Sequence, residues 1–410
     1  MMVRLALISD IHFGDMASSN EFVVPGQTAK GETAGAVSMS ESLIQLLEEN
    51  RVQYLFVCGD LTSRAKPQEF HYCAEKILSI AKGAGIPAEN IVWGVGNHDV
   101  DWNITKLAEA YKSEQSEIHE IANQVYRLLA VNAAASAVEQ IPMPQEKGPV
   151  PMSGIVETKD FVAFVLNSAL YCTHDQEFSH GRLGEEQLAW FRSTAPKYTE
   201  DRRWKIVLMH HHPHNYAYHT PVADISALED GSEFVEIAAE NGIQLVLHGH
   251  RHHPRAVTRH ETDWDDPITF ICAGSLSVNS DHRSQGAIPN TFHIIELTDT
   301  RGVLNLFNFE YSLSEGWRPL SWNRRETPLD AKMKLGRTIT AEVVESKIRS
   351  LAGFEGDYCI LRWEELDEDL QYKRYAVIND KMNELLSPCF TISGKFPDIV
   401  CLIRKGGNRP

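Results

Sequence analysis

Residues 91–102 read IVWGVGNHDVDW, an apolar run followed at once by Gly, Asn, His and Asp. The apolar run, residues 91–95, has the length of a fully buried strand. Turns favour Gly and Asn for backbone reasons, so a tight turn explains two of the four residues after it. His98 and Asp99 need another explanation, which depends on the residues found at the ends of the other strands.

Similar apolar runs recur along the chain, and amphipathic segments lie between several of them. Buried strands are predicted at residues 3–9, 54–58, 91–95, 204–209 and 243–248, and further strands at 157–168, 270–277, 292–298 and 303–311. Helices are predicted at 42–50, 69–83, 185–195 and 232–242. The alternation of buried strands and helices predicts an α/β fold in which helices cover both faces of the sheet.

The length of 410 residues is enough for one large domain and an appendage. We predict a main domain over residues 1–310, interrupted by a helical insertion over 103–152 that ends in a Pro-rich loop. A polar linker is predicted over 311–335 and a small C-terminal α+β domain of unknown role over 336–410. Residues 323–410 are nearly neutral whereas the preceding part is strongly acidic, which supports a separate C-terminal module.

The composition limits the partners and the compartment. A net charge of −17 argues against extended binding to a nucleic-acid backbone, but it allows a small phosphorylated substrate at one locally positive site. No apolar run approaches the roughly 18–20 residues that span a bilayer, and the run at 3–9 is broken by Asp10, unlike a signal peptide. Seven scattered cysteines without a CxxC pair fit reduced thiols. We therefore predict a cytoplasmic protein without membrane contact.

Side chains that commonly bind metals follow five of the predicted strands. They are Asp10 and His12 after the first, Asp60 after the second, Asn97 after the third, His210 to His212 after the fourth, and His248, His250, His252 and His253 after the fifth. A lone Asp-x-His or Gly-Asp is more often a turn than a ligand, but the five together predict a metal site, because ligands of α/β proteins bind beyond the carboxyl ends of strands. Some of the additional histidines are expected to be loop residues without a metal role: His211, His214, His219 and His253.

The ligand chemistry narrows the choice of metal. Carboxylate, amide and imidazole groups without cysteine suit manganese, iron(II) or zinc, of which we favour manganese. The ligands are too many for one tetrahedral ion, so two ions are predicted, with the central Asp60 as a bridge. Two ions about 3.5–4 Å apart hold a hydroxide and position both oxygens of an in-line displacement at phosphorus. Only Asp10 and Asp60 carry negative charge, so two dications leave the pocket positive toward a phosphate.

The ordered motifs DIH, GD, GNHD, the histidine after VLM, and GHRH resemble those of the metallophosphoesterase (calcineurin-like phosphoesterase) family over residues 3 to about 300. The resemblance implies a four-layer α/β/β/α sandwich and two metal positions. One position is implied to be held by Asp10, His12, Asp60 and His252, and the other by Asp60, Asn97, His210 and His250. His211 remains an alternative to His210, because a shift of one residue moves a strand side chain to the other face.

The resemblance also implies catalytic roles. His98 would face the scissile phosphate and assist the leaving group, and Asp99 would orient His98. The segment GDLTSRAKPQEF, residues 59–70, is most similar to the cyclic-nucleotide phosphodiesterase branch of the family. Several branches have a phosphate-binding arginine at the position of Arg64, although a solvated loop cation is an equally good interpretation of this residue.

We therefore expect a dinuclear-metal-dependent phosphoesterase that hydrolyses phosphodiester bonds of a small nucleotide-type substrate by in-line attack of a metal-bridging hydroxide. A DNA or RNA nuclease of the same family is the first alternative, and the acidic charge and the lack of a basic, aromatic-lined groove argue against it. A non-catalytic scaffold is the second, although no ligand position is visibly replaced. The C-terminal region is a candidate contact for an oligomer or a protein partner.

Overall fold

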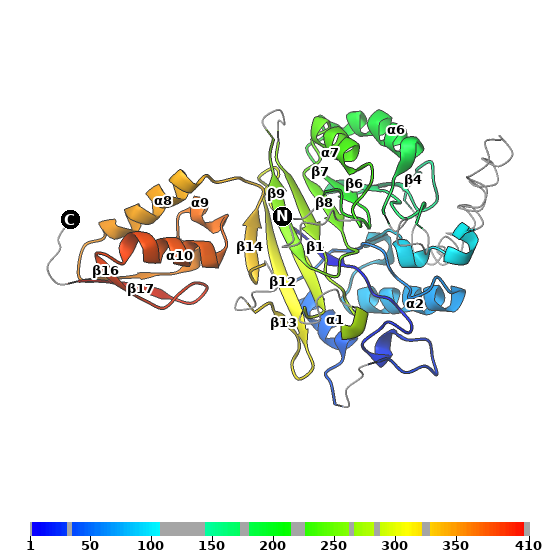
Figure 1. The fold of residues 1–410 in the computed structure, drawn as a ribbon, viewed down its shortest axis with the longest axis horizontal. Helices are drawn as coiled ribbons and strands as arrows, with labels where there is room; N and C mark the ends of the chain where they lie inside the picture. The colour runs from blue at the N-terminus through cyan, green and yellow to red at the C-terminus, as the bar shows by residue number, and fades with distance from the viewer. Residues whose placement is uncertain are drawn as a thin grey trace.

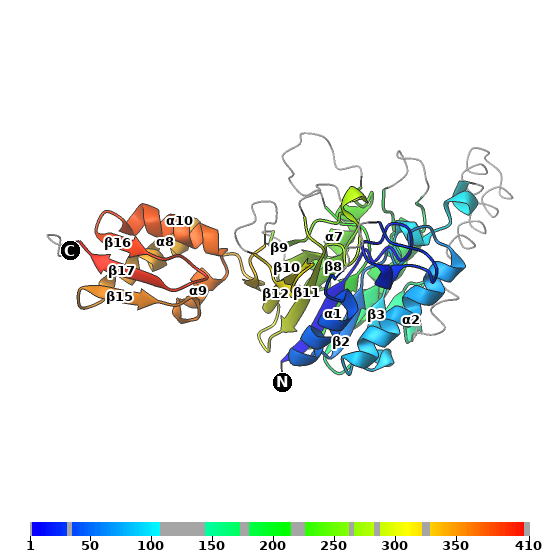
Figure 2. The same cartoon turned by 90° about the horizontal axis from the view of Figure 1, so that it is seen from below.

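The computed structural model of the protein describes residues 2–30, 35–106, 144–172, 180–214, 226–261, 266–282, 288–321 and 329–405. In these parts of the chain, two seven-stranded sheets form the main body, and a small module follows it (Figure 1, Figure 2). No helix within the described ranges is long and apolar enough to cross a membrane. The insertion predicted over 103–152 lies mostly outside the described residues, so its helices stay a prediction.

The first sheet has the strand order β13-β12-β11-β1-β2-β3, and β14 also pairs with β12. Its strands are β1 Val3–Ile8, β2 Tyr54–Val57, β3 Ile91–Trp93, β11 Thr291–Leu297, β12 Leu304–Ser312, β13 Gly316–Pro319 and β14 Lys332–Leu335. β1, β2 and β3 are parallel, and β11 is antiparallel to β1. The three parallel strands therefore end at one edge of the sheet, where the polar motifs follow them.

The second sheet has the strand order β4-β5-β6-β7-β8-β10-β9. Its strands are β4 Glu146–Lys147, β5 Gly154–Glu157, β6 Phe161–Val165, β7 Trp204–Leu208, β8 Leu245–His248, β9 Arg255–Arg259 and β10 Ile268–Cys272. β6, β7, β8 and β10 are parallel, and Leu208 of β7 lies opposite Leu247 of β8. This register makes the two histidine-rich loops after β7 and β8 neighbours.

Helices cover the outer face of each sheet, which makes four layers. They are α1 Met39–Glu49 and α2 Pro67–Gly83 on the first sheet, and α6 Gly184–Thr194 and α7 Gly231–Glu240 on the second. Strand β1 shows the pattern, since Leu5 and Leu7 pack between the sheets while Ala6 and Ile8 pack against the helix layer. The parallel strands are thus buried on both faces, and the predicted α/β/β/α fold is confirmed.

Residues 311–335, expected to be a linker, include two strands of the first sheet. β13 and β14 both pair antiparallel with β12. Trp317 of β13 is buried, lies edge-on to Phe292 at a centroid distance of 5.0 Å, and donates its indole N–H to the Met39 carbonyl. Short strands with polar or charged residues at every second position do not show the apolar run on which the prediction of strands depended.

The C-terminal module is an α+β unit with its own apolar core. Its elements are α8 Ala341–Ser350, β15 Tyr358–Leu361, α9 Glu368–Gln371, α10 Tyr375–Leu386, β16 Phe390–Ser393 and β17 Val400–Arg404. The strands are antiparallel in the order β15-β17-β16. Ile348 of α8, Ile378 of α10 and Leu402 of β17 meet in the core of this module.

The module adjoins the first sheet beside β14, away from α2 and α6 (Figure 1). The carboxylate of Asp330 accepts a hydrogen bond from the Tyr375 amide at 2.8 Å. Lys334 Nζ lies 2.6 Å from Glu368 Oε1. The module is therefore attached at the β14 edge, and its core is separate from those of the sandwich.

Candidate metal centre

The polar motifs of the two sheets meet at one edge of the sandwich. The loops after β1 and β2 run side by side, and the His12 amide donates to the Asp60 carbonyl at 2.9 Å. The loop after β8 reaches across to the first sheet, where the His250 amide donates to Asp10 Oδ2 at 3.2 Å. The site is thus assembled from both sheets, which explains why its motifs are distributed over most of the sequence.

Two motif glycines are required because backbone and side chain approach each other closely. A Cβ atom on Gly96 would collide with the Oδ1 atom and the amide of Asp60. A Cβ atom on Gly249 would collide with Ser9 Oγ and would lie 2.6 Å from Asp10 Oδ2. Each glycine therefore gives a neighbouring carboxylate its space, which answers why a glycine precedes the ligands of these loops.

Five of the predicted ligands adopt the left-handed backbone region, which residues other than glycine usually avoid. Their φ angles are 51° for Asp10, 50° for His12, 49° for Asp60, 74° for His250 and 51° for His252. Such a conformation costs about 1–3 kcal/mol per residue and persists where the surrounding structure enforces it, commonly at functional sites. The strain here is concentrated on the residues whose side chains converge.

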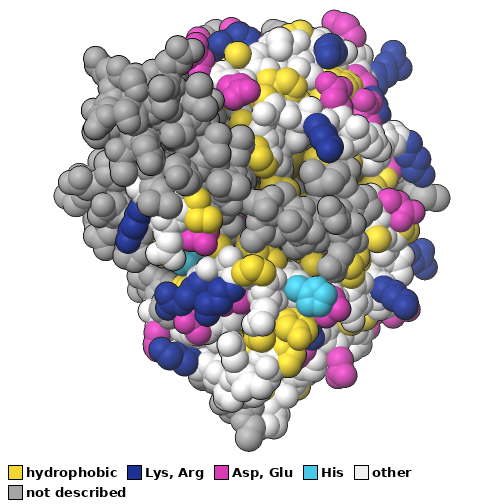
Figure 3. Space-filling view, turned by 90° about the vertical axis from the view of Figure 1, so that its right-hand side faces the viewer, with side chains coloured by type: hydrophobic (Ala, Val, Ile, Leu, Met, Phe, Trp, Pro, Cys, Tyr) yellow, Lys and Arg dark blue, Asp and Glu magenta, His cyan; other side chains and the backbone are white. Residues whose placement is uncertain are grey.

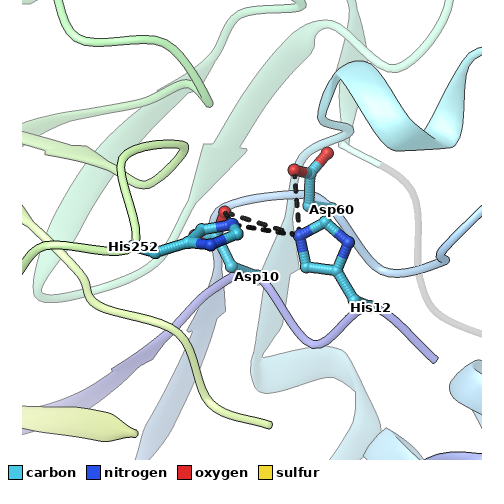
Figure 4. A group of neighbouring side chains, drawn as sticks. All are labelled: Asp10, His12, Asp60 and His252. Carbon is cyan, nitrogen blue, oxygen red and sulfur yellow. Dashed lines mark hydrogen bonds and ion pairs between the residues drawn. The ribbon is translucent and has the colours of Figure 1, made fainter. Parts of the chain in front are cut away.

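Four side chains form the first ligand group, with one ligand atom of each within 4.8 Å of the others (Figure 4). They are Asp10, His12, Asp60 and His252. His12 Nε2 lies 3.3 Å from Asp60 Oδ2 and 3.2 Å from His252 Nε2. His252 Nε2 in turn lies 3.2 Å from Asp10 Oδ1. The structure therefore brings together the four residues expected at one metal position.

Asp60, His210 and His250 form a second ligand group, and the Asn97 amide oxygen lies among them. Asp60 Oδ2 is 3.2 Å from His210 Nε2. Asn97 Oδ1 is 3.1 Å from His210 Nε2 and 2.9 Å from His250 Nδ1. The same oxygen of Asp60 thus faces both groups, as in a carboxylate that bridges two ions.

The hydrogen bonds around the two ligand groups leave the inward-facing oxygen and nitrogen atoms available to bind metal ions. Asp10 Oδ1 is buried and accepts no backbone hydrogen bond among the described residues, and it faces His252 Nε2 at 3.2 Å. His210 Nδ1 donates to the Cys58 carbonyl at 2.7 Å, so Nε2 keeps its lone pair for a metal. Asp60 Oδ1 accepts from the His98 amide at 2.8 Å, which directs Oδ2 inward. This set of oxygen and nitrogen donors fits two divalent ions.

The groups influence one another electrostatically. Burial alone would raise the pKa of Asp60, but the surrounding imidazoles, of which His210 acts most strongly, hold it well below its usual value. Burial lowers the pKa of His12 to about 4, against the attraction of Asp60. Burial also acts against protonation of His210, but Asp60 outweighs it and raises the pKa of His210 to about 9. In protein stripped of metal, the pocket therefore holds a proton on His210, which a metal ion must displace.

Asp99 does not orient the His98 ring, contrary to the role implied by the resemblance. Its buried carboxylate accepts hydrogen bonds from three backbone amides in the loops after β2 and β3. These are the amides of Leu61, Thr62 and Gly96, at 3.1, 2.9 and 2.9 Å. Burial and the charge of Asp60 raise the pKa of Asp99 to about 7, opposed by these amides. Asp99 therefore joins two ligand-bearing loops and makes no hydrogen bond to the His98 imidazole within the described residues.

His98 borders the first ligand group. Its ring lies edge-on to that of His12, with centroids 4.6 Å apart, and its side chain is half-buried. Its Nδ1 donates to the Ser63 carbonyl at 3.1 Å. Nδ1 is therefore the ring nitrogen of His98 that is held by the loop after β2.

Ser63 is a site residue that the sequence did not single out. Its hydroxyl donates to the His12 carbonyl at 2.7 Å and accepts from the Met16 amide at 3.1 Å, while its carbonyl accepts from His98. Ser63 thus holds the loop of the first motif and the imidazole of the third. A serine in a loop carries no signal of such a role, because the role depends on which loops lie beside it.

The structure separates His210 from its alternative, His211. His210 Nε2 faces Asp60 and Asn97, whereas His211 belongs to neither ligand group. The His211 ring has its Nδ1 2.9 Å from Ser168 Oγ, and it packs against the His250 ring with centroids 4.4 Å apart. His211 is therefore a buried neighbour of a ligand.

The remaining candidates lie outside the ligand groups. Arg64 is exposed, and its Nε lies 2.8 Å from Asp15 Oδ2. His214 and His253 belong to neither group of the described residues, and His219 lies outside the part of the chain that the structure describes.

Comparison with known proteins gives one family and several relatives. The family model for calcineurin-like phosphoesterases matches residues 3–254. Purple acid phosphatase 17 of Arabidopsis thaliana is 33% identical over 75 residues, which are 18% of this chain and 20% of that protein. The matched part is thus only about a fifth of the length of this curated relative.

Solved structures that are similar to this chain have low sequence identity to it. A purple acid phosphatase from yellow lupin (Lupinus luteus) seeds is 14% identical with a TM-score of 0.50, over 77% of this chain and 52% of that one. A dimetal phosphatase from Danio rerio is 12% identical with a TM-score of 0.44, over 75% of this chain and 95% of that one. The family model covers more than half of the sequence and every motif of the two ligand groups. The chain therefore belongs to the calcineurin-like phosphoesterase family.

Proposed function

We propose that this protein is a metal-dependent phosphodiesterase that acts on a small nucleotide-type substrate. The observation that carries the proposal is Asp60 Oδ2, which lies 3.3 Å from His12 Nε2 in one ligand group and 3.2 Å from His210 Nε2 in the other. Two divalent ions bound there would supply Lewis acidity and an activated water for in-line displacement at phosphorus. Membership of the family supports the coarser conclusion, a metal-dependent phosphoesterase.

The residues around the ligand groups support this chemistry. Asp10 and Asp60 are the two carboxylates of the ligand set, so two dications leave a net positive pocket for a phosphoryl group. His98 stands beside His12 with its Nδ1–H held by the Ser63 carbonyl, so in the imidazolium form its Nε2–H would give a proton to the leaving oxygen. Besides the two metal ions, Arg64 is a candidate for binding the phosphoryl oxygens.

A small substrate suits the acidic chain better than a nucleic-acid duplex does. The net charge is −17. On the face shown in Figure 3, basic and acidic side chains are interspersed over the described residues, without a continuous basic track. Binding along a phosphate backbone needs several clustered cations to displace its counterions. The resemblance of residues 59–70 to the cyclic-nucleotide branch also favours a small substrate. Nuclease activity is the alternative that the experiment below distinguishes.

The test is hydrolysis of bis(p-nitrophenyl) phosphate by the full chain with added manganese, with Asp60→Asn as the inactive control. We expect turnover by the parent protein only. Cyclic nucleotides are then compared with single-stranded and duplex DNA of equal phosphate concentration. A preference for DNA by several orders of magnitude would replace the small substrate by a nuclease function, and no turnover together with no bound metal would favour a scaffold.

The metal and the compartment are part of the same proposal. Manganese is favoured, and elemental analysis of protein purified without added metal tests this choice. Within the described residues the seven cysteines form no disulfide, which supports a reducing compartment such as the cytoplasm. Localisation of the tagged full chain in its cells of origin tests that assignment.

A further inference from the structure

An ion pair connects the two loops that carry Asp10, His12 and Asp60. Arg64 Nε lies 2.8 Å from Asp15 Oδ2, and the two side chains are 58% and 49% exposed. Exposed pairs of this kind contribute little to stability. The pair is therefore of more interest for its place next to Ser63, which contacts His12 and His98, than for what it adds to the stability of the fold.

The backbone on both sides of the pair is fixed. Phe13 forms a parallel bridge with Thr62, so the two loops continue the pairing of β1 with β2. The Met16 amide, next to Asp15, donates to Ser63 Oγ at 3.1 Å, and the Arg64 amide donates to the buried Glu69 carboxylate at 2.9 Å. Asp15 and Arg64 are therefore held in place beside Ser63, the residue whose carbonyl binds the His98 ring.

The guanidinium of Arg64 is only partly used. Its Nε contacts Asp15, and within the described residues its two terminal nitrogens make no hydrogen bond. An arginine can bind two phosphoryl oxygens through a pair of its nitrogens, in a planar fork that a carboxylate or a phosphate fits. The terminal nitrogens of Arg64 can therefore bind a phosphoryl group while Nε stays with Asp15.

We propose that Asp15 is a specificity-determining residue that favours monoanionic phosphodiesters over dianionic phosphomonoesters. The inference rests on the proposed function and names the feature that would select its substrate class. A phosphoryl group bound to the terminal nitrogens of Arg64 shares one guanidinium with the Asp15 carboxylate. At pH 8 a monoester carries a charge of about −2, because its second pKa is about 6, whereas a diester carries one negative charge. The Asp15 carboxylate therefore repels a monoester more strongly than a diester.

The test is Asp15→Asn, which keeps the size of the side chain and removes its charge. The kcat/KM of p-nitrophenyl phosphate is divided by that of bis(p-nitrophenyl) phosphate, for the metal-loaded full chain at pH 8 and low salt. We expect this ratio to rise about threefold to tenfold, mainly through a lower KM for the monoester, and the rise to shrink at 0.5 M salt because exposed charges are screened. Glu75→Gln, an exposed acid on α2, is the matched control and leaves the ratio unchanged.

A binding measurement separates this inference from the proposed function. Calorimetric titration with methyl phosphate and dimethyl phosphate reports affinity without turnover, and Asp15→Asn is expected to tighten the dianion more than the monoanion, so that the ratio of the two affinities shifts by a similar factor. Failure of the parent protein to hydrolyse any ester rejects the proposed function, whatever the titration shows. Turnover by the parent with an unchanged ratio and unchanged affinities in Asp15→Asn overturns the role of Asp15. If Asp15→Asn raises the monoester-to-diester ratio as much in Arg64→Ala protein as in the parent protein, the phosphoryl group and Asp15 do not share the guanidinium of Arg64.

Discussion

At the scale of the residue, Asp60 is the side chain on which both ligand groups depend. Asp60→Asn removes the charge while keeping the shape, and we expect binding at both metal positions to weaken by at least about tenfold, because even groups that only support a ligand contribute that much. Turnover should fall with it. Metal content by elemental analysis after dialysis is the measurement, with the exposed Asp398→Asn as a control for loss of one charge. A full complement of two metals in Asp60→Asn would reject the bridging role.

The proton on His210 predicts how metal affinity depends on pH. The pKa of His210 is raised to about 9 by Asp60 against the effect of burial, so below that pH a metal must displace one proton. The pKa of His12 is lowered to about 4, so His12 is already neutral and releases none. We therefore expect apparent affinity to rise about tenfold per pH unit between pH 7 and 8 and to level off near pH 9.

This pH dependence is measured by calorimetric titration of chelator-treated protein with manganese, in buffers that differ in their ionisation enthalpy. Such a comparison counts the protons released, and one proton per protein is expected at pH 7. Affinity that does not change between pH 7 and 8 would show that His210 is neutral before the metal arrives.

The sequence was informative about ligands and uninformative about the residues that hold them. Asp10, Asp60 and His210 were found because a metal-binding side chain directly after a buried strand is unusual, and five such cases in order are specific. The sequence pattern alone does not decide between His210 and His211, since the choice depends on which of two adjacent side chains faces the other sheet. The contacts of Ser63 depend on which loops are neighbours in space, and a single sequence does not contain that information.

At the scale of the element, Asp99 fixes the loop after β2 to the loop after β3. Asp99→Ala leaves three buried backbone amides without their acceptor, and each costs about 1–3 kcal/mol. We therefore expect the free energy of unfolding to fall by about 3 kcal/mol or more, together with a loss of metal, because both loops carry ligands. Thermal and denaturant unfolding of the metal-free protein measure the first effect.

Asp99→Asn separates the observed role from the one implied by family resemblance. An amide keeps one acceptor oxygen, so an intermediate loss of stability is expected. A residue that only oriented His98 would reduce turnover and leave unfolding unchanged. That pattern would contradict the geometry, in which His98 Nδ1 is bound by Ser63.

The strands differed in how well they could be predicted, and their burial explains the difference. β1, β2, β3, β7 and β8 are buried on both faces, so they appear as continuous apolar runs. β14 reads KMKL and, among the described strands, pairs only with β12. Its two lysines interrupt the apolar residues at every second position. A four-residue strand of this kind is recognised only once its partner strand is known.

At the scale of the whole molecule, the charge of the metal pocket differs from the net charge of the chain. The chain is strongly acidic, yet the ligand set holds two carboxylates against imidazoles and an amide. Its ligands come from loops of both sheets, so the pocket forms only when the sheets pack. Metal binding and folding of the sandwich should therefore be coupled, as binding to the native state alone raises stability.

The C-terminal module has a separate core, and this predicts the result of removing it. A chain that ends at residue 338 keeps β14 in the first sheet and loses α8 to β17. It also loses the Lys334–Glu368 pair and the Asp330–Tyr375 hydrogen bond, which together contribute about 1–2 kcal/mol. We expect this shortened protein to fold, to bind two metals and to hydrolyse a small diester within about twofold of the full chain, since its ligand groups lie wholly in the sandwich.

A chain that ends at residue 328 is the matched comparison, because it also removes β14 and uncovers the edge of β12 beside Leu304 and Leu306. Its stability should fall further, as apolar side chains of the layer between the sheets gain contact with water. Turnover, metal content and native mass of the two shortened proteins are measured side by side. If the chain ending at 338 keeps its metals but loses activity on the diester, the module takes part in binding substrate. If the shortened protein keeps its metals and activity but its native mass corresponds to fewer chains per particle, the module is the contact between copies of the chain.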